Sequence, residues 1–264
     1  MESALVPAIE RWQQLIVIAR RILTLPVCHW LRSKWKKIDY STPVGWVRLG
    51  SLGRVKPLSC DYGYDRGMPI DRFYIEKFIS THERDIRGHV LEIADDNYTR
   101  QFGGDRVIKS DVLHVSAGDP KATLVGDLSS ANHIPSNTFD CVIITQTLQL
   151  IYDVRAALQT IYRILKPGGV VIATFPGISP ISRYDAERWG YYWSFTSQSA
   201  RRLFGEVFPP DQIQIGVYGN VLSAATFLYG MATEELKQKE LEYFDPDYEV
   251  IIGVRAARPA NEPF

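Results

Sequence analysis

The sequence predicts an α/β fold, in which helices cover both faces of a mostly parallel β-sheet. The first observation is the stretch of residues 139–174, which reads FDCVIITQTLQLIYDVRAALQTIYRILKPGGVVIAT. In this stretch two apolar runs flank a helical pattern, and a strand–helix–strand of this length forms a right-handed parallel unit. The second observation is that further apolar runs alternate with helical segments on both sides of it.

The unit at 139–174 can be justified residue by residue. Cys141–Ile144 forms an apolar strand, and the polar Thr145 and Gln146 end it. Asp153 is placed as the N-cap of a helix over Val154–Leu165. The run Lys-Pro-Gly-Gly at 166–169 stops this helix, because proline cannot continue it and glycine allows a left-handed reversal. Val170–Thr174 is then the next strand.

The remaining elements follow from the same patterns. A helix is expected at Ile70–Ser80, with Ile70, Phe73, Tyr74 and Phe78 on one face. Thr196 caps a helix that runs to Phe204, another helix lies near Leu222–Met231, and a third opens at Thr233. The other expected strands are Gly88–Ile93, Arg106–Val112, Ala122–Leu128, Gln212–Tyr218 and Glu249–Ala256.

The connections between the first three strands are unusually short. About a dozen residues separate the first two strands and about nine separate the second from the third, too few for full crossover helices. The first connection should therefore hold one or two helical turns, and the second a mere turn. We expect the segment before residue 81 to cover the face left bare.

Composition excludes several classes of protein. The 264 residues carry 30 basic and 30 acidic side chains, which argues against a general nucleic-acid binder. Cys28, Cys60 and Cys141 form no CxxC pair, so a reducing cytoplasm fits best. No secretory signal is recognisable at the N-terminus, and the histidines lack metal-ligand spacing, so no metal is assigned.

Residues 1–40 are expected to form an amphipathic helical extension. Its stretch 11–37 contains several lysines and arginines and no acid, interleaved with aliphatic residues and tryptophans. Such a helix can lie on an anionic membrane surface, which would make the protein peripheral at the inner face of the membrane. It can equally pack on the main domain or form a homodimer interface, with its basic face in solvent.

The stretch 139–176 resembles the fourth and fifth strands of class I S-adenosylmethionine (SAM)-dependent methyltransferases. The Phe-Asp start, the Leu-Lys-Pro-Gly-Gly helix end and the exit Thr174-Phe175-Pro176 carry this resemblance. It implies a Rossmann-like three-layer sandwich with a seven-stranded sheet and an antiparallel seventh strand. The implied organisation is a lid segment at 41–85, a methyltransferase domain at 86–257 and a tail at 258–264.

The resemblance also implies a SAM site at the carboxyl ends of the first four strands. Glu92 matches the acid that the family places in its first strand, and Asp111 with Val112 stands where an acid accepts from both ribose hydroxyls. Asp127 and Leu128 stand where the adenine amino group is bound, and Thr145 with Gln146 closes the site.

The loop after the first strand departs from the family. Its three glycine positions hold Ala94, Asp96 and Tyr98, although Asp and Asn97 tolerate left-handed angles better than most residues. Asp95 or Asp96 could pair with the ammonium of SAM. Two interpretations stay open: a modified SAM site, or a site that has lost SAM.

The acceptor side is less clearly marked. The family's usual histidine base is replaced by Leu150, which leaves Asp65 and Gln146 as the catalytic candidates. Acceptor binding is assigned to the segment 61–72, whose Asp and Arg residues could alternatively pair with each other, and to the aromatic run 189–196, which could alternatively pack the core. The candidates are Tyr64, Arg66, Arg72, Tyr191 and Trp193.

These observations favour SAM-dependent methylation of a small molecule or glycan, with O-methylation of a sugar as the leading hypothesis. The whole pattern also resembles type 11-like methyltransferases that accompany glycosyltransferases in polysaccharide biosynthesis. The alternative is a non-catalytic, methyltransferase-like binding partner or membrane-associated scaffold.

Overall fold

The computed structural model describes residue 42 and residues 45–260. The chain divides into two compact units, residues 1–55 and residues 56–264. The described part of the first unit contains one short 3-10 helix, Gly50–Leu52. The predicted extension at 1–40 lies outside the described residues, and the boundaries at residues 40 and 85 remain predictions.

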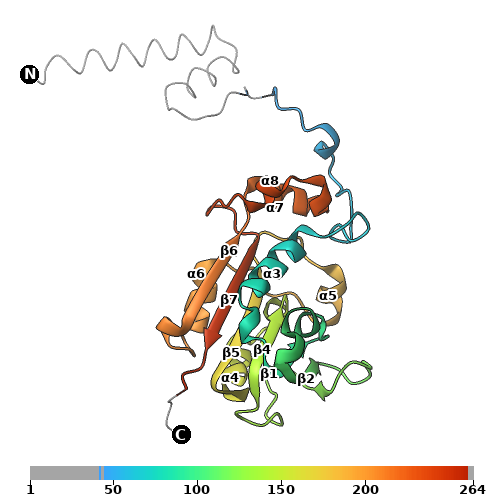
Figure 1. Cartoon of the computed structure of the whole chain (residues 1–264). Coiled ribbons are helices and arrows are strands. Elements are labelled where there is room, and N and C mark those ends of the chain that lie inside the picture. Colours follow the sequence, from blue (N-terminus) through green and yellow to red (C-terminus); the bar gives the residue numbers. More distant parts are fainter. Residues whose placement is uncertain (1–41, 43–44, 261–264) are drawn as a thin grey trace, which may run out of the picture. The chain divides into compact units, whose positions relative to one another are not determined.

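The second unit is built on one seven-stranded sheet (Figure 1). Its strand order is β3-β2-β1-β4-β5-β7-β6, and only β7 runs antiparallel to its neighbours. The strands are β1 Gly88–Ile93, β2 Val107–His114, β3 Leu124–Val125, β4 Phe139–Thr145, β5 Leu165–Pro176, β6 Ile213–Tyr218 and β7 Ile251–Ala257. The predicted Rossmann-like sheet with an antiparallel seventh strand is thereby confirmed.

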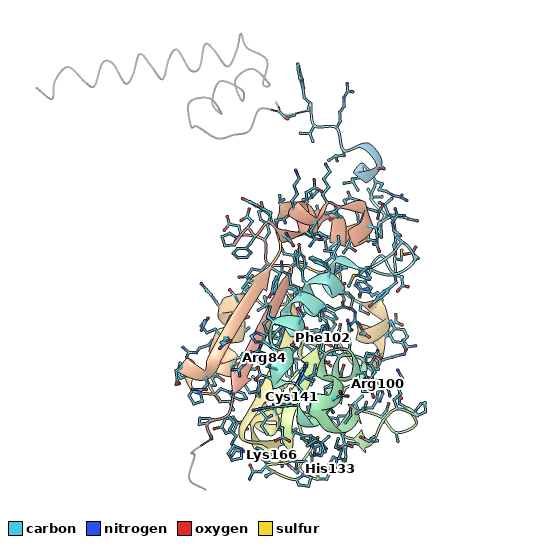
Figure 2. The ribbon with its side chains drawn as sticks, viewed as in Figure 1. Arg84, Arg100, Phe102, His133, Cys141 and Lys166 are labelled. Atoms are coloured by element: carbon cyan, nitrogen blue, oxygen red, sulfur yellow. The ribbon has the colours of Figure 1, made fainter. Side chains whose placement is uncertain are left out.

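Helices cover both faces of this sheet, which makes three layers. Side chains of α4 and α6 pack on one face, and those of α3 and α7 pack on the other (Figure 1). Cys141 of β4 is buried between the layers, where burial raises the pKa of its thiol (Figure 2). The helices are α3 Ile70–Thr81, α4 Val154–Ile164, α5 Arg183–Arg188, α6 Ser197–Phe204, α7 Val221–Leu228 and α8 Gln238–Glu242.

Helix α3 covers the β6–β7 side of the sheet through Phe78. Gly216 and Gly253 pair across β6 and β7, and a Cβ atom on Gly253 would lie only 2.5 Å from the Phe78 ring. The two glycines therefore make a flat seat for this aromatic side chain. The predicted apolar helix before residue 81 is thus part of the core of the second unit.

The expected short connections are present. A single π-helical turn, Thr99–Gly103, and a 3-10 turn follow β1, and no helix lies between β2 and β3. Three strand predictions were wrong in extent, because β2 continues to His114, β3 comprises only Leu124–Val125, and β5 spans Leu165–Pro176. The helix predicted at Thr233 is a 3-10 turn, Thr233–Glu235, followed by α8.

Candidate active site

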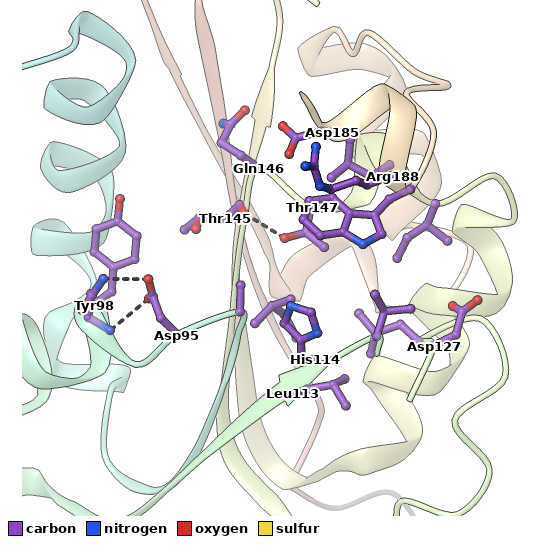
Figure 3. A pocket seen from close by; sticks show the side chains of 18 of the residues that line it. Asp95, Tyr98, Leu113, His114, Asp127, Thr145, Gln146, Thr147, Asp185 and Arg188 are labelled. Atoms are coloured by element: carbon purple, nitrogen blue, oxygen red, sulfur yellow. Dashed lines mark hydrogen bonds between the residues drawn. The ribbon is translucent and has the colours of Figure 1, made fainter. Parts of the chain in front are cut away.

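One large pocket opens at the carboxyl ends of the parallel strands, with a volume of about 1190 Å³ (Figure 3). The ends of β1, β2 and β4 form its floor, since Ile93, Leu113 and Thr145 all line it. Helix α3 and the segment before it form one wall, and α5 with the residues after it forms another. This is the place where open α/β sheets bind ligands.

The pocket gathers about half of the residues predicted from the sequence. Those that line it are Tyr64, Arg72, Ala94, Asp95, Asn97, Asp127, Leu128, Thr145 and Gln146. Those that do not line it are Asp65, Arg66, Glu92, Asp96, Asp111, Val112, Tyr191 and Trp193. Five of the second group have other partners in the structure, which explain what their side chains do: Arg66, Glu92, Asp96, Asp111 and Trp193.

Glu92 is a buried anchor for the loop after β1. Its carboxylate accepts hydrogen bonds from Tyr98 N at 3.1 Å, Thr99 N at 2.7 Å and Thr99 Oγ1 at 2.7 Å. Burial raises the pKa of Glu92 to about 7, and the three hydrogen bonds oppose that rise. Glu92 therefore holds the loop after β1 in place and does not line the pocket.

Two non-glycine residues of the pocket have left-handed backbone. Ala94, directly after β1, has φ of 73°, and Gln146, directly after β4, has φ of 46°. The Ala94 amide donates to Leu113 O at 3.0 Å, and the Gln146 amide donates to Thr174 O at 3.0 Å. Such conformations cost about 1–2 kcal/mol in a residue with a Cβ and concentrate at functional sites. The loop thus keeps the turn that glycine would give.

The two neighbouring aspartates of this loop have different positions. Asp95 lines the pocket, and its carboxylate accepts hydrogen bonds from Asn97 N and Asn97 Nδ2. Asp96 lies outside the pocket and forms an ion pair with Arg100 at 2.6 Å. Of the two aspartates that the sequence left open, only Asp95 lines the pocket.

Asp111 does not stand where the sequence placed it. It pairs with Leu91 in the middle of the sheet, three residues before the end of β2. Its carboxylate lies 2.6 Å from His89 Nε2, and it accepts from Lys109 Nζ at 2.8 Å and from Thr123 Oγ1 at 2.9 Å. Burial raises the pKa of Asp111, but these hydrogen bonds outweigh burial and leave the pKa below its usual value. Its prediction as the residue that ends β2 was wrong, because Leu113 and His114 continue the strand.

His114 occupies the end of β2 in its place. Its Nδ1 lies 3.0 Å from Ser116 O, and its ring meets Trp189 edge to face at 6.3 Å between centroids. Figure 3 shows His114 on the pocket floor between Asp95 and Asp127. The sequence analysis missed His114 because it expected this strand to end at Val112, two residues before its actual end.

The third strand end holds Asp127, as predicted, although β3 stops two residues earlier. Asp127 lines the pocket, and its Oδ1 accepts from Ser129 N and Ser129 Oγ, each at 2.8 Å. These two bonds fix the carboxylate in the turn after β3 and leave Oδ2 without a hydrogen-bond partner among the described residues.

The lid segment reaches the pocket through Tyr64 and Arg72. Arg72 Nε donates to Tyr64 Oη at 2.7 Å, and Arg72 Nη1 donates to Tyr98 Oη, whose ring lies under the guanidinium at 5.5 Å. Burial lowers the pKa of Arg72, but the two phenols outweigh it and raise the pKa further. Arg72 forms no ion pair with any residue in the described part of the chain, so its second terminal nitrogen is available to a ligand.

Arg66 has a different role, because its side chain ties the segment before α3 to the segment after α7. Its guanidinium forms a two-pronged ion pair with Glu235, at 3.0 Å and 2.5 Å. The same lid is tied to the segment after α7 by Thr233 N donating to Met68 O and by Leu58 N donating to Tyr229 O. Asp65 lies outside the pocket, so it is not placed to act as a base.

The wall opposite the lid consists of α5 and the aromatic residues after it. Asp185, Arg188, Trp189 and Tyr192 line the pocket there, and Figure 3 shows Asp185 and Arg188 beside Thr147. Arg188 stacks on the ring of Tyr184 at 3.5 Å. The aromatic run was predicted, but its members alternate: Tyr192 faces the pocket, whereas Trp193 donates to Ile151 O and packs on Tyr152.

Residues 84–173 match the model of a protein family described as "Methyltransferase domain". The matched range runs from the turn before β1 into β5 and includes every strand end that lines the pocket floor. This match confirms the class I SAM-dependent methyltransferase domain recognised from the sequence.

Curated relatives match over a shorter range. The ubiquinone/menaquinone biosynthesis C-methyltransferase UbiE of Enterobacter sp. (strain 638) is 46% identical over 56 residues, which is 20% of this chain and 22% of that protein. The same protein of Escherichia coli K12 / DH10B matches with the same identity and coverage. The chain thus spans about a fifth of the length of the curated relatives it matches.

Solved structures with a similar chain path include two N-methyltransferases. The N-methyltransferase NodS of Bradyrhizobium japonicum WM9, solved with S-adenosylhomocysteine, has a TM-score of 0.46 and 14% identity, covering 79% of this chain and 94% of that chain. Phosphoethanolamine N-methyltransferase 2 of Haemonchus contortus, solved with SAM, has a TM-score of 0.44 and 17% identity, covering 66% and 49%. By their names, UbiE is a C-methyltransferase and NodS is an N-methyltransferase.

Proposed function

We propose that this chain, whose residues 84–173 form a methyltransferase domain of the SAM-dependent class I family, is an active enzyme that methylates a hydroxyl group of a small molecule or glycan, with a sugar as the acceptor. One observation carries the proposal. A single cavity runs from the loop after β1 and the strand ends to a wall made by α5 and the aromatic residues Trp189 and Tyr192 after it. Donor and acceptor can therefore meet in line within one cavity.

The donor half is assigned to the strand ends. The loop at 94–97 would hold the methionine part of SAM, and Asp127 would accept from the adenine amino group. In place of an acid, His114 at the end of β2 would face the ribose hydroxyls. Imidazole can serve as donor or acceptor to a hydroxyl, so the exchange is chemically possible.

Arg72 and Asp95 suit the two charges of the amino-acid tail. Arg72 lies against Tyr98, directly after the cofactor loop, and presents an unpaired edge of its guanidinium to the pocket. A guanidinium binds a carboxylate in two-pronged geometry. Asp95 can accept from the ammonium while it holds Asn97. Arg72 would thereby offset the repulsion between the acidic loop at 94–97 and the carboxylate of SAM.

The acceptor half is assigned to the α5 wall. Trp189 and Tyr192 offer flat faces to a sugar ring, and Asp185 lines the same wall. The Asp185 carboxylate accepts no hydrogen bond from any other described residue, so it can accept the proton of an attacking hydroxyl. In this assignment Asp185, rather than Asp65 or Gln146, is the base.

Cofactor binding is the first test. Calorimetric titration of the full chain with S-adenosylhomocysteine should give micromolar or tighter binding, and Arg72→Gln should weaken it roughly 10- to 100-fold. Arg155→Gln is the matched control, because Arg155 pairs with Glu206 at the surface, lies outside the pocket and should leave affinity unchanged. Absence of binding at millimolar ligand would favour the alternative of a non-catalytic, methyltransferase-like partner.

Turnover is the second test. Incubation with labelled SAM and a panel of sugars should give a methylated product, which mass spectrometry can locate. Asp185→Asn should lower kcat at least a hundredfold with cofactor affinity intact, as expected for loss of a general base. Glu187→Gln on the same helix is the control, because Glu187 does not line the pocket.

A further inference from the structure

The charges of this chain are strongly divided along the sequence. Residues 11–60 contain ten lysines and arginines and one acid, Asp39, for a net charge of +9. Because the whole chain has 30 basic and 30 acidic residues, the remainder carries a net charge of −9. A basic segment (residues 11–60, the basic arm) joined to an acidic remainder is typical of a protein that attaches to a polyanionic surface.

The described end of this arm adds large exposed apolar side chains. Trp46 is 68% exposed, Leu49 is 59% exposed, and Val55 is fully exposed. Arg48 and Lys56 stand among them, and no acid occurs among the described residues before Asp61. The apolar side chains belong to the first compact unit, whose described part contains no buried residue.

We infer that residues 45–56 dock on an anionic phospholipid bilayer. Tryptophan favours the interface between headgroups and acyl chains, and the neighbouring cations pair with anionic headgroups. Nucleic acid would complement the charge but offers no apolar phase for Leu49 and Val55. In a second copy of this chain, the basic arm has the same net charge of +9, so two arms would repel each other unless each met the acidic remainder of the other copy.

The docking segment leads without interruption into the lid. Residues 58–69 follow it in the chain, and Tyr64, Met68 and Pro69 of that stretch line the pocket. A bilayer that holds residues 45–56 would therefore hold the chain next to the segment that borders the acceptor. This arrangement favours an acceptor presented at a lipid surface, although the docking itself is independent of the proposed methyl transfer.

Vesicle binding of the full chain tests the inference. Sedimentation with phosphatidylcholine vesicles containing about 30% phosphatidylglycerol should retain the protein, and pure phosphatidylcholine should not. R48Q/K56Q should weaken binding about 25-fold, at about fivefold for each lost cation. K237Q/K239Q is the matched control, because it removes two exposed lysines from the second unit and should leave binding unchanged.

The apolar contribution has its own pair of variants. Trp46→Ser should weaken vesicle binding about tenfold, whereas Tyr243→Ser, at an aromatic side chain that is 66% exposed on the second unit, should not. S-adenosylhomocysteine affinity should stay unchanged in all four variants, which separates this inference from the proposed function.

Three outcomes would overturn the inference. The first is equal binding to neutral and anionic vesicles. The second is equal behaviour of R48Q/K56Q and K237Q/K239Q. The third is tighter binding to duplex DNA than to vesicles, or sedimentation without vesicles through self-association. In either case, loss of that binding or sedimentation in Trp46→Ser would assign it to residues 45–56.

Discussion

Replacing Glu92 with glutamine separates two roles that a buried acid in β1 can have. The structure gives it an anchoring role, because both carboxylate oxygens accept hydrogen bonds from Tyr98 and Thr99. The variant keeps the size of the side chain but turns one acceptor oxygen into an NH2 donor. Whichever way the amide is oriented, at least one buried N–H of the loop then faces a donor.

The expected magnitude follows from these contacts. The milder orientation keeps both bonds from Thr99 and leaves only Tyr98 N unsatisfied, which costs about 1–3 kcal/mol. The opposite orientation leaves Thr99 N unsatisfied and forces the Thr99 hydroxyl to turn and accept from the amide, so the milder one should prevail. We expect the free energy of unfolding at pH 5, below the raised pKa of Glu92, to fall by about 2 kcal/mol.

Urea unfolding and calorimetry on the same samples give the result. Under conditions where the variant is folded, its S-adenosylhomocysteine affinity should fall by less than about fivefold, since Glu92 does not line the pocket. Asp96→Asn is the control, because Asp96 lies in the same loop and pairs with Arg100 near the surface. Unchanged stability would refute the anchoring role. A large loss of affinity at unchanged stability would show that Glu92 contacts the ligand.

Three further predictions concern neighbouring carboxyl groups. Burial raises the pKa of Glu92 from 4.5 to about 7, so its stabilising contribution is complete below pH 4.5 and is lost as the pH rises through 7. In urea titrations, wild type should therefore lose stability relative to Glu92→Gln between pH 5 and 8. Parallel curves of unfolding free energy against pH for the two proteins would contradict this. Asp95→Asn should weaken S-adenosylhomocysteine about tenfold and spare 5′-methylthioadenosine, which lacks the amino-acid tail, while Asp96→Asn should affect neither in calorimetry. Asp111→Asn should lower the free energy of unfolding by about 1–3 kcal/mol and leave cofactor affinity intact. Because the pKa of Asp111 is depressed in the folded protein, the stability advantage of wild type should vanish as the pH falls below 4. A loss of affinity without a loss of stability would instead show that Asp111 binds the ribose.

The sheet was predictable because its signal is local. Runs such as Cys141–Ile144 and Val170–Thr174 are apolar on both faces, and the Asp153 cap and Lys-Pro-Gly-Gly stop bound the helix between them. The short connections were equally readable, since counting residues limits what a crossover can contain. These features require no knowledge of distant partners.

The site was harder to predict, because its details depend on contacts between remote segments. Asp111 looked like a strand end in the sequence. Only its position opposite Leu91 and the contact of its carboxylate with His89 on the neighbouring strand show that it lies within the strand. Asp185 and Arg188 belong to the short helix α5, which has no buried residue and hence no apolar period to mark it. The partner of Arg66, Glu235, lies 169 residues away.

The charge of the pocket bears on the acceptor. The side chains that line it include five carboxylates and two guanidinium groups, which gives a formal charge of −3 with His114 neutral. The carboxylates are Glu76, Asp95, Asp127, Asp153 and Asp185, and the guanidinium groups are Arg72 and Arg188.

SAM itself carries a net charge of +1 from its ammonium, sulfonium and carboxylate, so this pocket attracts the donor. A phosphorylated acceptor would bring two further negative charges into the same space, and the two arginines do not balance the carboxylates already there. We therefore expect a neutral sugar to be methylated with a kcat/KM at least about tenfold higher than its phosphate ester, with the gap narrowing as ionic strength rises. Steady-state rates on a matched sugar and sugar phosphate measure this preference. A preference for the phosphate ester would mean that Arg188 and Arg72 dominate the acceptor half and that the carboxylates serve only the donor.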